Sequence, residues 1–215
     1  MSTHRDDDSP RPSMNKLQLI RYMLKPLVFL ACLVPFALVL TDTYGITGTL
    51  GANPIENVQD RFGQWGLRFI MITLAVTPLR QISGRNWVAG FRRMLGLFAF
   101  FYVLLHFLVW LFLDQTLLLS AIAEDILERP FITIGMTALI VLLAMAMTST
   151  AGMRRRLGST WQKIHNGIYL TGILGVWHYW WQVKEDITEP LIYAAVLSVL
   201  LGHRIWHRHQ KRGHS

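Results

Sequence analysis

The sequence of 215 residues contains only one cysteine, Cys32. A single cysteine excludes an intramolecular disulfide, and it cannot supply the set of thiolates that a zinc cluster or an iron–sulfur centre needs. The C-x-x-C-H motif that attaches haem through thioether bonds is missing as well. If this chain holds a haem, we therefore expect a noncovalent haem b.

The sequence also lacks the motifs of a self-contained enzyme. Glycines 45, 48 and 51 do not have the G-x-G-x-x-G spacing of a dinucleotide site, and the segment 41–63 around them is expected to be a turn-rich loop. No soluble domain and no nucleophile arrangement is recognisable, which indicates that substrate chemistry takes place on a partner. We expect the chain not to be an enzyme by itself.

Charged residues are almost missing from several long stretches, and hydrophobic residues make up 52% of the chain. Such stretches are typical of membrane-spanning helices, which need about 20 predominantly apolar residues. We identify six candidates, at residues 25–41, 66–79, 95–113, 131–148, 164–181 and 190–206. The sequence therefore predicts an all-α membrane protein, a multi-pass bundle of six transmembrane helices formed by residues 21–206.

Acidic residues are fewer than basic ones, 13 against 21, and the basic residues alternate from loop to loop. They are concentrated in the N-terminal segment and in residues 80–93, 154–163 and 204–212, whereas the intervening loops hold only Arg61, Arg129 and Lys184. The positive-inside rule then places both termini in the cytoplasm. These charges flank spans and form no patch of their own, so membrane lipid is the expected partner and nucleic acid is not.

The segments outside the spans are expected to carry little structure, with one exception. Residues 1–20 are predicted to be a disordered cytoplasmic tail, and residues 207–215 a basic cytoplasmic tail. The loop 114–130 has enough apolar residues to form a short interfacial helix, in which Glu124, Asp125 and Glu128 would face water.

Three histidines lie within or beside the apolar segments. His106 and His178 each follow a basic boundary, Arg93 and Lys163 respectively, by a distance that corresponds to about 20 Å of helix, so they reach nearly the same depth. His165 lies near the cytoplasmic side. Because an unpaired imidazole in hydrocarbon is costly, these residues are candidate metal ligands, and His106 with His178 forms a complete pair for one haem iron.

Helix geometry leaves two alternatives for the histidines of the fifth segment. On an ideal helix, His165 and His178 lie about 140° apart around the axis, so they do not face one partner together. Either the glycines at 167, 172 and 175 allow the helix to deform, or the two histidines address different neighbours. Small residues near the histidines, Ala99, Gly172 and Gly175, suit a bulky ring as well as plain helix packing.

Two other classes of protein compete with a haem protein at this point. A transporter or structural membrane protein would pair the histidines with polar side chains in its core. A metal reductase would need its own NAD(P)H and flavin domain, or a substrate site in the outer loops, and neither is visible in the sequence.

Several motifs together resemble one known family. They are LGANPIENVQ, TLAVTPLR, RRMLGLFAFFYVLLH, ERPFITIG, TSTAGMRRRLGSTWQKIHNGIYL and HYWWQVK, and the resemblance covers residues 25–206. The chain is similar to the haem-binding membrane subunits of bacterial protein-methionine-sulfoxide reductase systems. These belong to the wider group with a ferric-reductase-like transmembrane domain, which includes the NADPH oxidases.

The resemblance implies a function in electron transfer across the bacterial cell inner membrane. Haem b, one or two per chain, would pass electrons to a periplasmic molybdopterin subunit that reduces methionine sulfoxide in oxidised envelope proteins. FMN is implied as a further cofactor, and quinol or a cytosolic flavin reductase as the electron donor.

The resemblance also places the haem histidines of the family on His106, His165 and His178. Arg92 and Arg93 stand where the oxidases have a lower histidine, so the partner of His165 stays open; His203 has a fitting depth but lies outside the family motif. Arg92 and Arg93 are nevertheless included among the cofactor-binding candidates, with Arg68 as a possible partner of a haem propionate at the outer boundary.

Overall fold

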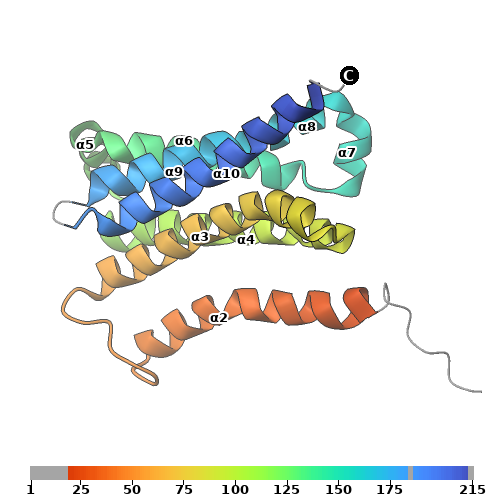
Figure 1. Cartoon of the computed structure of the whole chain (residues 1–215). Helices are drawn as coiled ribbons and strands as arrows, with labels where there is room; N and C mark the ends of the chain where they lie inside the picture. Colours follow the sequence, from red (N-terminus) through yellow and green to blue (C-terminus); the bar gives the residue numbers. More distant parts are fainter. Residues whose placement is uncertain (1–18, 184–185, 213–215) are drawn as a thin grey trace, which may run out of the picture.

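The computed structural model describes residues 19–183 and 186–212, and these residues form helices and loops without a strand. The long helices lie roughly side by side (Figure 1). In chain order the elements are η1 (Ile20–Leu24), α2 (Lys25–Thr43), α3 (Pro54–Ser83), η2 (Asn86–Phe91), α4 (Arg92–Val109), η3 (Trp110–Asp114), α5 (Leu119–Glu128), α6 (Pro130–Met147), α7 (Ala151–Leu157), α8 (Ser159–His165), α9 (Gly167–Gln182) and α10 (Thr188–Arg212).

Four helices form a closed ring that determines where a site can lie. Helix α3 packs on α4, α4 on α6, α6 on α9, and α9 on α3. Helix α10 covers α9 and α3 from outside, while α2 lies against α3 and α4 on the other side of the bundle (Figure 1). The interior of the α3–α4–α6–α9 ring is therefore the sheltered part of the molecule.

Within the described residues, three helical stretches are long and apolar enough to cross a membrane: Tyr22–Thr43, Asn86–Asp114 and Pro130–Met147. Large apolar side chains on the outside of the bundle remain exposed, including Leu27, Ile140 and Val199 at 63%, 63% and 70%. An apolar surface of this kind suits contact with lipid. The six-span count and the cytoplasmic position of the termini remain predictions; the start of α2 and the end of α10 do lie at the same end of the bundle (Figure 1).

The two ends of the bundle differ in charge. Arg80, Arg92 and Arg204 lie at one end, which we call the basic end. The other end, which we call the acidic end, carries the described carboxylates, since α3, α6 and α10 begin there and α2, η3 and α9 end there. These carboxylates are Asp42, Glu56, Asp60, Asp114, Glu124, Asp125, Glu128, Asp186 and Glu189.

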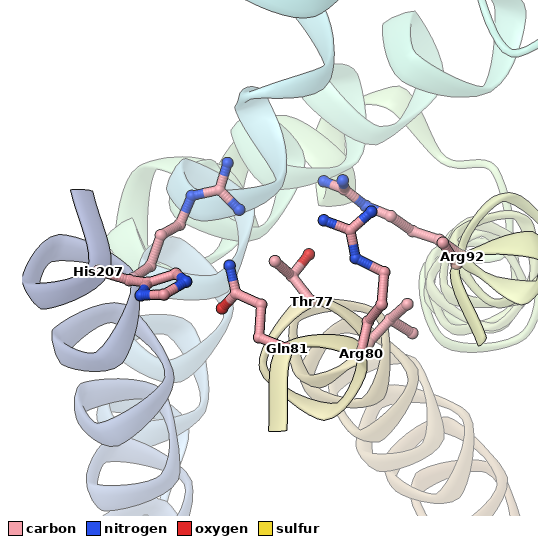
Figure 2. Close-up of a pocket in the computed structure, with 8 residues that line it drawn as sticks. Thr77, Arg80, Gln81, Arg92 and His207 are labelled. Carbon is pink, nitrogen blue, oxygen red and sulfur yellow. The ribbon is translucent and has the colours of Figure 1, made fainter. Parts of the chain in front are cut away.

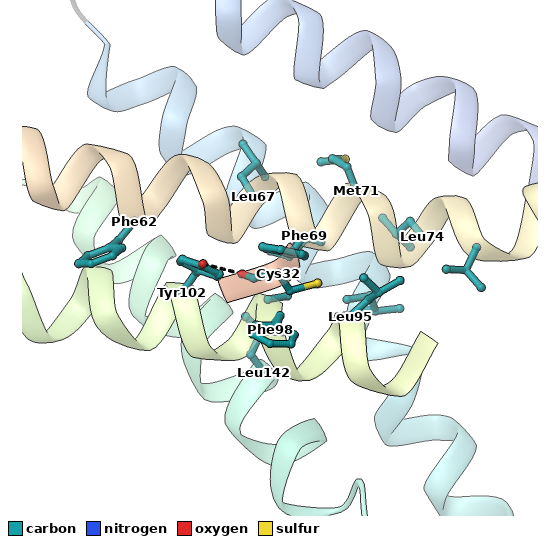
Figure 3. Close-up of a cluster of buried hydrophobic side chains, with 14 of the residues drawn as sticks. Cys32, Phe62, Leu67, Phe69, Met71, Leu74, Leu95, Phe98, Tyr102 and Leu142 are labelled. Carbon is teal, nitrogen blue, oxygen red and sulfur yellow. Dashed lines mark hydrogen bonds between the residues drawn. The ribbon is translucent and has the colours of Figure 1, made fainter. Parts of the chain in front are cut away.

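The phenol of Tyr102 on α4 forms hydrogen bonds with the backbone of helix α2. Pro35 lies within α2, and next to it the hydroxyl of Tyr102 donates to the carbonyl of Cys32 at 2.7 Å and accepts from the N–H of Phe36 at 3.1 Å. The Tyr102 side chain thus bridges a carbonyl and an N–H that would otherwise bond each other in the helix. Tyr102 is fully buried and stacks on Phe69 at 5.3 Å (Figure 3).

Several sequence-based boundaries need correction. The expected loop 41–63 is much shorter, because α2 continues to Thr43 and α3 already begins at Pro54, with Asn53 accepting a bond from the backbone N–H of Glu56 as its cap. Proline at the first helical position and a side-chain cap before it both favour this early start.

The predicted tails lie partly outside the described residues. Residues 1–18 lie outside the described residues, and Leu19 and Ile20 at the end of the predicted N-terminal tail are helical. Helix α10 continues through most of the predicted tail 207–215 to Arg212, and residues 213–215 lie outside the described residues.

The interfacial helix expected in the loop 114–130 is present as α5, but one of its acidic residues does not face water. Glu124 and Glu128 are exposed, whereas Asp125 is buried. The Asp125 carboxylate accepts from the indole of Trp110 at 2.9 Å and forms an ion pair with Arg129 at 3.0 Å. The expectation was wrong for Asp125 because tertiary partners stabilise a carboxylate that amphipathic periodicity alone assigns to water.

Candidate functional site

The imidazoles of His106 and His178 face each other inside the helical ring. His106 projects from the last turn of α4 and His178 from α9, and their ring centroids are 6.1 Å apart with an angle of 84° between the ring planes. The structure thus brings together the two histidines for which the sequence predicts equal depth.

Each of these imidazoles is held by a backbone carbonyl of the neighbouring helix. Nδ1 of His106 lies 2.8 Å from the carbonyl oxygen of Gln59 on α3, and Nδ1 of His178 lies 2.7 Å from that of Phe131 on α6. A carbonyl oxygen only accepts, so Nδ1 carries the proton in both rings. The Nε2 atoms are then the basic nitrogens, and a hydrogen bond at Nδ1 is the arrangement that orients a metal-ligating imidazole.

Two glycines make room for the imidazole rings. A Cβ atom at Gly63, one turn after Gln59, would lie 2.9 Å from Nδ1 of His106. A Cβ atom at Gly135, one turn after Phe131, would lie 3.0 Å from both Nδ1 and Cε1 of His178. Both separations are too short for a side chain, so glycine is required for the helices to approach this closely.

The two halves of the site repeat each other in sequence and in structure. Both histidine-to-carbonyl bonds span 47 residues, and each histidine packs on a glycine at the same offset. The pair α3–α4 therefore supplies one imidazole, and the pair α6–α9 supplies the other in the same way. This repeated construction brings the two imidazoles together.

A cavity of about 970 Å³ surrounds the two histidines. Its inner part is apolar and is lined from all four helices of the ring by Leu67, Ile70, Val103, Ala138, Leu139, Leu142 and Gly175. Carboxylates lie around the part nearest the acidic end, namely Glu56, Asp60, Asp114, Asp125 and Asp186. The pKa of Asp186 is lowered mainly by a hydrogen bond from the side chain of Thr188 and also by one from the Thr188 backbone N–H. This carboxyl therefore stays ionised.

The residues present fit a haem held between two imidazoles. A metal–imidazole bond is about 2 Å long, and a ring nitrogen lies about 1 Å from its ring centre, so two imidazoles on one metal have centroids about 6 Å apart. The observed 6.1 Å agrees, and rotation of each ring about its metal–nitrogen bond permits the 84° between their planes. The apolar walls and the volume also suit a large flat macrocycle.

Arg68 is placed beside this cavity and does not line it. Its guanidinium donates to the hydroxyl of Tyr193 at 3.0 Å and to the side-chain oxygen of Gln64 at 3.2 Å, and it lies over the ring of Trp65 at 4.8 Å. Gln64 does line the cavity. Any contact of Arg68 with a propionate remains a prediction that requires the side chain to leave these partners.

His165 belongs to a different environment. The fifth apolar segment is broken at Asn166, so that His165 ends α8 while His178 lies on α9, and the two histidines address different neighbours. Nε2 of His165 lies 3.2 Å from the hydroxyl of Thr148, and its ring stacks on Trp161 at 4.0 Å. Among the described residues, no second histidine ring is in contact with His165; His203 instead contacts Trp206 and His207.

The arginines of the basic end do not converge on one centre with His165. Arg92 starts α4 and carries its charge close to the His165 ring, whereas Arg93 is exposed. Arg93 precedes His106 by the same number of residues as His165 precedes His178. In the repeated construction of this fold, Arg93 thus occupies the position that corresponds to His165.

Sequence reasoning found the histidines but missed their supports. The small residues it singled out have other roles: Gly172 packs against Leu197 and Leu74, and Ala99 is buried in the core, while only Gly175 lines the cavity. Gly63 and Gly135 were not identified. The equal spacing of glycine and histidine in the two halves is the signal that could have revealed them.

Comparison with known families defines the class of the protein. The family model described as "Ferric reductase like transmembrane component" matches residues 62–176, which include α4, α6 and the facing histidine His106. The helical ring with its pair of facing imidazoles is thus a bundle of the ferric-reductase-like transmembrane class, and the chain is a membrane protein.

Individual relatives narrow this class. A protein-methionine-sulfoxide reductase heme-binding subunit MsrQ from Xanthomonas euvesicatoria pv. vesicatoria is 48% identical over 186 residues, which cover 85% of both chains. The MsrQ proteins of Ralstonia nicotianae and Herminiimonas arsenicoxydans are 49% and 44% identical, over 83% and 94% of this chain and 83% and 91% of their own. The chain belongs to the MsrQ family.

Proposed function

We propose that this protein is the haem b-binding membrane subunit of a protein-methionine-sulfoxide reductase system and that it transfers electrons through its membrane domain. The observation that carries this proposal is the pair His106 and His178, at 6.1 Å within an apolar cavity of about 970 Å³. The names of the relatives, which describe heme-binding subunits of such a reductase, support it.

The chain's own residues would determine the character of the bound group. His106 and His178 would hold the haem, and the bound haem would supply one-electron transfer. The carbonyls of Gln59 and Phe131 fix the ring orientation and make the ligating nitrogens more basic. The apolar side chains inside the α3–α4–α6–α9 bundle would exclude water from the haem.

Reduction of methionine sulfoxide would take place on a partner, and the chain would not be an enzyme by itself. We assign this step to a periplasmic molybdopterin subunit that reduces oxidised envelope proteins. The cavity with the histidine pair lies toward the acidic end, which the positive-inside rule places outside the cytoplasm. A partner that docks at this end would be close to the electron donor.

Electrons would enter from the opposite, basic end in the bacterial inner membrane. Quinol or a cytosolic flavin reductase is the proposed donor, and FMN is a proposed second cofactor. His165, with its stacked Trp161, lies on this entry side. One haem is assigned to the histidine pair; a second would need a partner for His165 that the described residues do not present.

The decisive experiment measures haem per chain in purified wild type and in His106→Ala and His178→Ala. Wild type is expected to show a Soret band and, after dithionite, paired α and β bands, and each variant is expected to lose this spectrum because one of the two histidines that would hold the haem is missing. His209→Ala, an exposed histidine on α10, is the matched control and should retain full haem. Full haem content in both variants would contradict the site.

A second measurement addresses the reductase function. The protein in proteoliposomes, supplied with the periplasmic partner, is expected to support reduction of a methionine-sulfoxide peptide, and the two histidine variants are not. If haem is present and reducible but no electrons reach the partner, a metal reductase becomes the better assignment. If wild type remains colourless after haem supplementation, a transporter or structural protein does.

A further inference from the structure

A second cavity lies at the basic end, away from the histidine pair. It has a volume of about 290 Å³ and lies between α3, η2, α4 and α10 (Figure 2). Most of its lining is polar or cationic: Thr77, Arg80 and Gln81 on α3, Arg92 on α4, and Arg204 and His207 on α10, with Val76 and Ala89 completing the wall. Helices far apart in sequence thus contribute three guanidinium groups to one small cavity.

Among the described residues, no carboxylate is available to neutralise Arg80 and Arg92. The sequence has no Asp or Glu in residues 9–41, 61–113, 129–184 or 190–215, which include every segment at this end that the structure describes. Asp6, Asp7 and Asp8 lie outside the described residues. The two ion pairs among the described residues, Arg61 with Asp42 and Arg129 with Asp125, are both at the acidic end.

Arg80 and Arg92 are nevertheless directed into the same space. Figure 2 shows the guanidinium ends of Arg80 and Arg92 extending into the same space above Thr77, with Gln81 and His207 beside it. Arg204 is held with its guanidinium over the ring of Tyr169, at 4.5 Å. Like charges that share a partly buried cavity repel each other, and a bound anion removes this cost.

We propose that this cavity binds the phosphate group of a phosphate-bearing ligand. The planar forks of arginine match phosphate oxygens with paired hydrogen bonds, and Thr77, Gln81 and His207 add donors around the same space. A volume of about 290 Å³ holds a phosphate and part of the group attached to it. The phosphate can come from the head group of an anionic phospholipid or from a soluble phosphate monoester.

This site is independent of the proposed haem, and only its soluble-monoester outcome rests on the proposed FMN cofactor. Neither His106 nor His178 lines the cavity, so loss of anion binding leaves the Soret spectrum unchanged if both assignments are correct. Conversely, a colourless protein can still bind phosphate. The spectrum and the binding measurement thus report the two assignments separately.

The experiment compares full-length wild type with Arg80→Gln/Arg92→Gln in three arms. The first arm measures binding of inorganic phosphate by calorimetry. The second compares FMN with riboflavin, which differs from FMN only in lacking the phosphate. The third uses native mass spectrometry to compare phosphatidylglycerol with phosphatidylcholine. We expect the double variant to bind phosphate-bearing probes at least about tenfold more weakly, since each lost fork removes charge-assisted hydrogen bonds.

A charge-matched variant separates a specific pocket from general attraction. Arg85→Gln/Arg155→Gln removes two exposed arginines of the same end that do not line the cavity, and it should bind as wild type does. Added phosphate should raise the melting temperature of wild type and of this control, and not that of the pocket variant. Arg80→Lys/Arg92→Lys, which retains charge without the forks, provides a second pocket variant in case the glutamine variant does not fold.

The arms also identify the source of the phosphate. Preference for phosphatidylglycerol that depends on Arg80 and Arg92 assigns a lipid head group, whereas preference for FMN over riboflavin that depends on them assigns a soluble monoester. Equal binding of every probe by wild type and both pocket variants overturns the proposal. So does equal binding of FMN and riboflavin together with equal binding of the two lipids.

Discussion

The glycines behind the two imidazoles allow a sharp test of the candidate site. We predict that Gly63→Ala and Gly135→Ala each weaken haem binding although neither residue is an axial ligand. The added methyl group would lie 2.9 Å from a ring atom of His106 or 3.0 Å from two ring atoms of His178. Carbon–nitrogen contacts in proteins are comfortable at about 3.5 Å, so each ring must shift by about half an ångström.

The expected magnitude follows from what this shift disrupts. The carbonyl that holds Nδ1 lies on the same helix as the new methyl, so the ring cannot avoid the methyl and keep its 2.8 or 2.7 Å hydrogen bond unchanged. Overpacking costs about 1 to 3 kcal/mol, and a weakened hydrogen bond costs about 1 kcal/mol. The lower bound of the sum, about 2 kcal/mol, corresponds to at least about thirtyfold weaker haem binding.

The assay is a haem titration of the apoprotein followed at the Soret band. Gly202→Ala on α10 is the control, because its Cβ would have nothing within 4 Å, and it should bind haem as wild type does. A weaker affinity in both cavity variants, with an unchanged Gly202→Ala, supports the geometry. Wild-type affinity and spectrum in Gly63→Ala and Gly135→Ala together would refute the reasoning that the rings are held where they are observed.

Two further predictions concern residues outside the histidine pair. His165→Ala should retain the Soret band of the pair but slow its reduction by a donor at the basic end, while dithionite reduction stays the same; an unchanged rate from that donor would exclude a role in electron entry. Tyr102→Phe should lower the free energy of unfolding by about 1 to 2 kcal/mol, because its hydroxyl links α4 to the backbone of α2. Thermal unfolding in detergent checks this against Tyr44→Phe, which is 78% exposed and should change little.

The depth of the histidines was predictable from the sequence because it depends only on helix rise and on basic boundaries. Arg93 and Lys163 mark one side of the apolar segments, and a constant rise then places His106 and His178 at one level. The structure agrees, since the ring centroids of His106 and His178 are 6.1 Å apart. That the two rings ligate one iron remains a prediction. The sequence alone permits two relations between His165 and His178, and the break at Asn166 gives the two histidines different neighbours.

Contacts between helices could not be predicted in the same way. The carbonyls of Gln59 and Phe131 are backbone atoms, and nothing in the identity of these residues marks them as partners of an imidazole. The same holds for Asp125, whose burial depends on Trp110 and Arg129 reaching it from other turns of the chain. Hydrophobic periodicity reports the average face of a helix, whereas a single buried polar group depends on the particular side chains that approach it.

The repeated construction of the bundle explains why its two ends differ in chemistry. At the level of His106 and His178 both halves supply an imidazole, each fixed by a carbonyl and backed by a glycine, so the two halves present a symmetric pair of imidazoles. Nearer the basic end the repeat is broken, because His165 in one half corresponds in position to Arg93 in the other. A second centre built like the first therefore lacks one of its ligands. Arginines and a small cavity occupy this end instead, and such a site favours an anion over a second bis-imidazole metal. The same backbone arrangement thus suits an iron centre at one end and a phosphate group at the other.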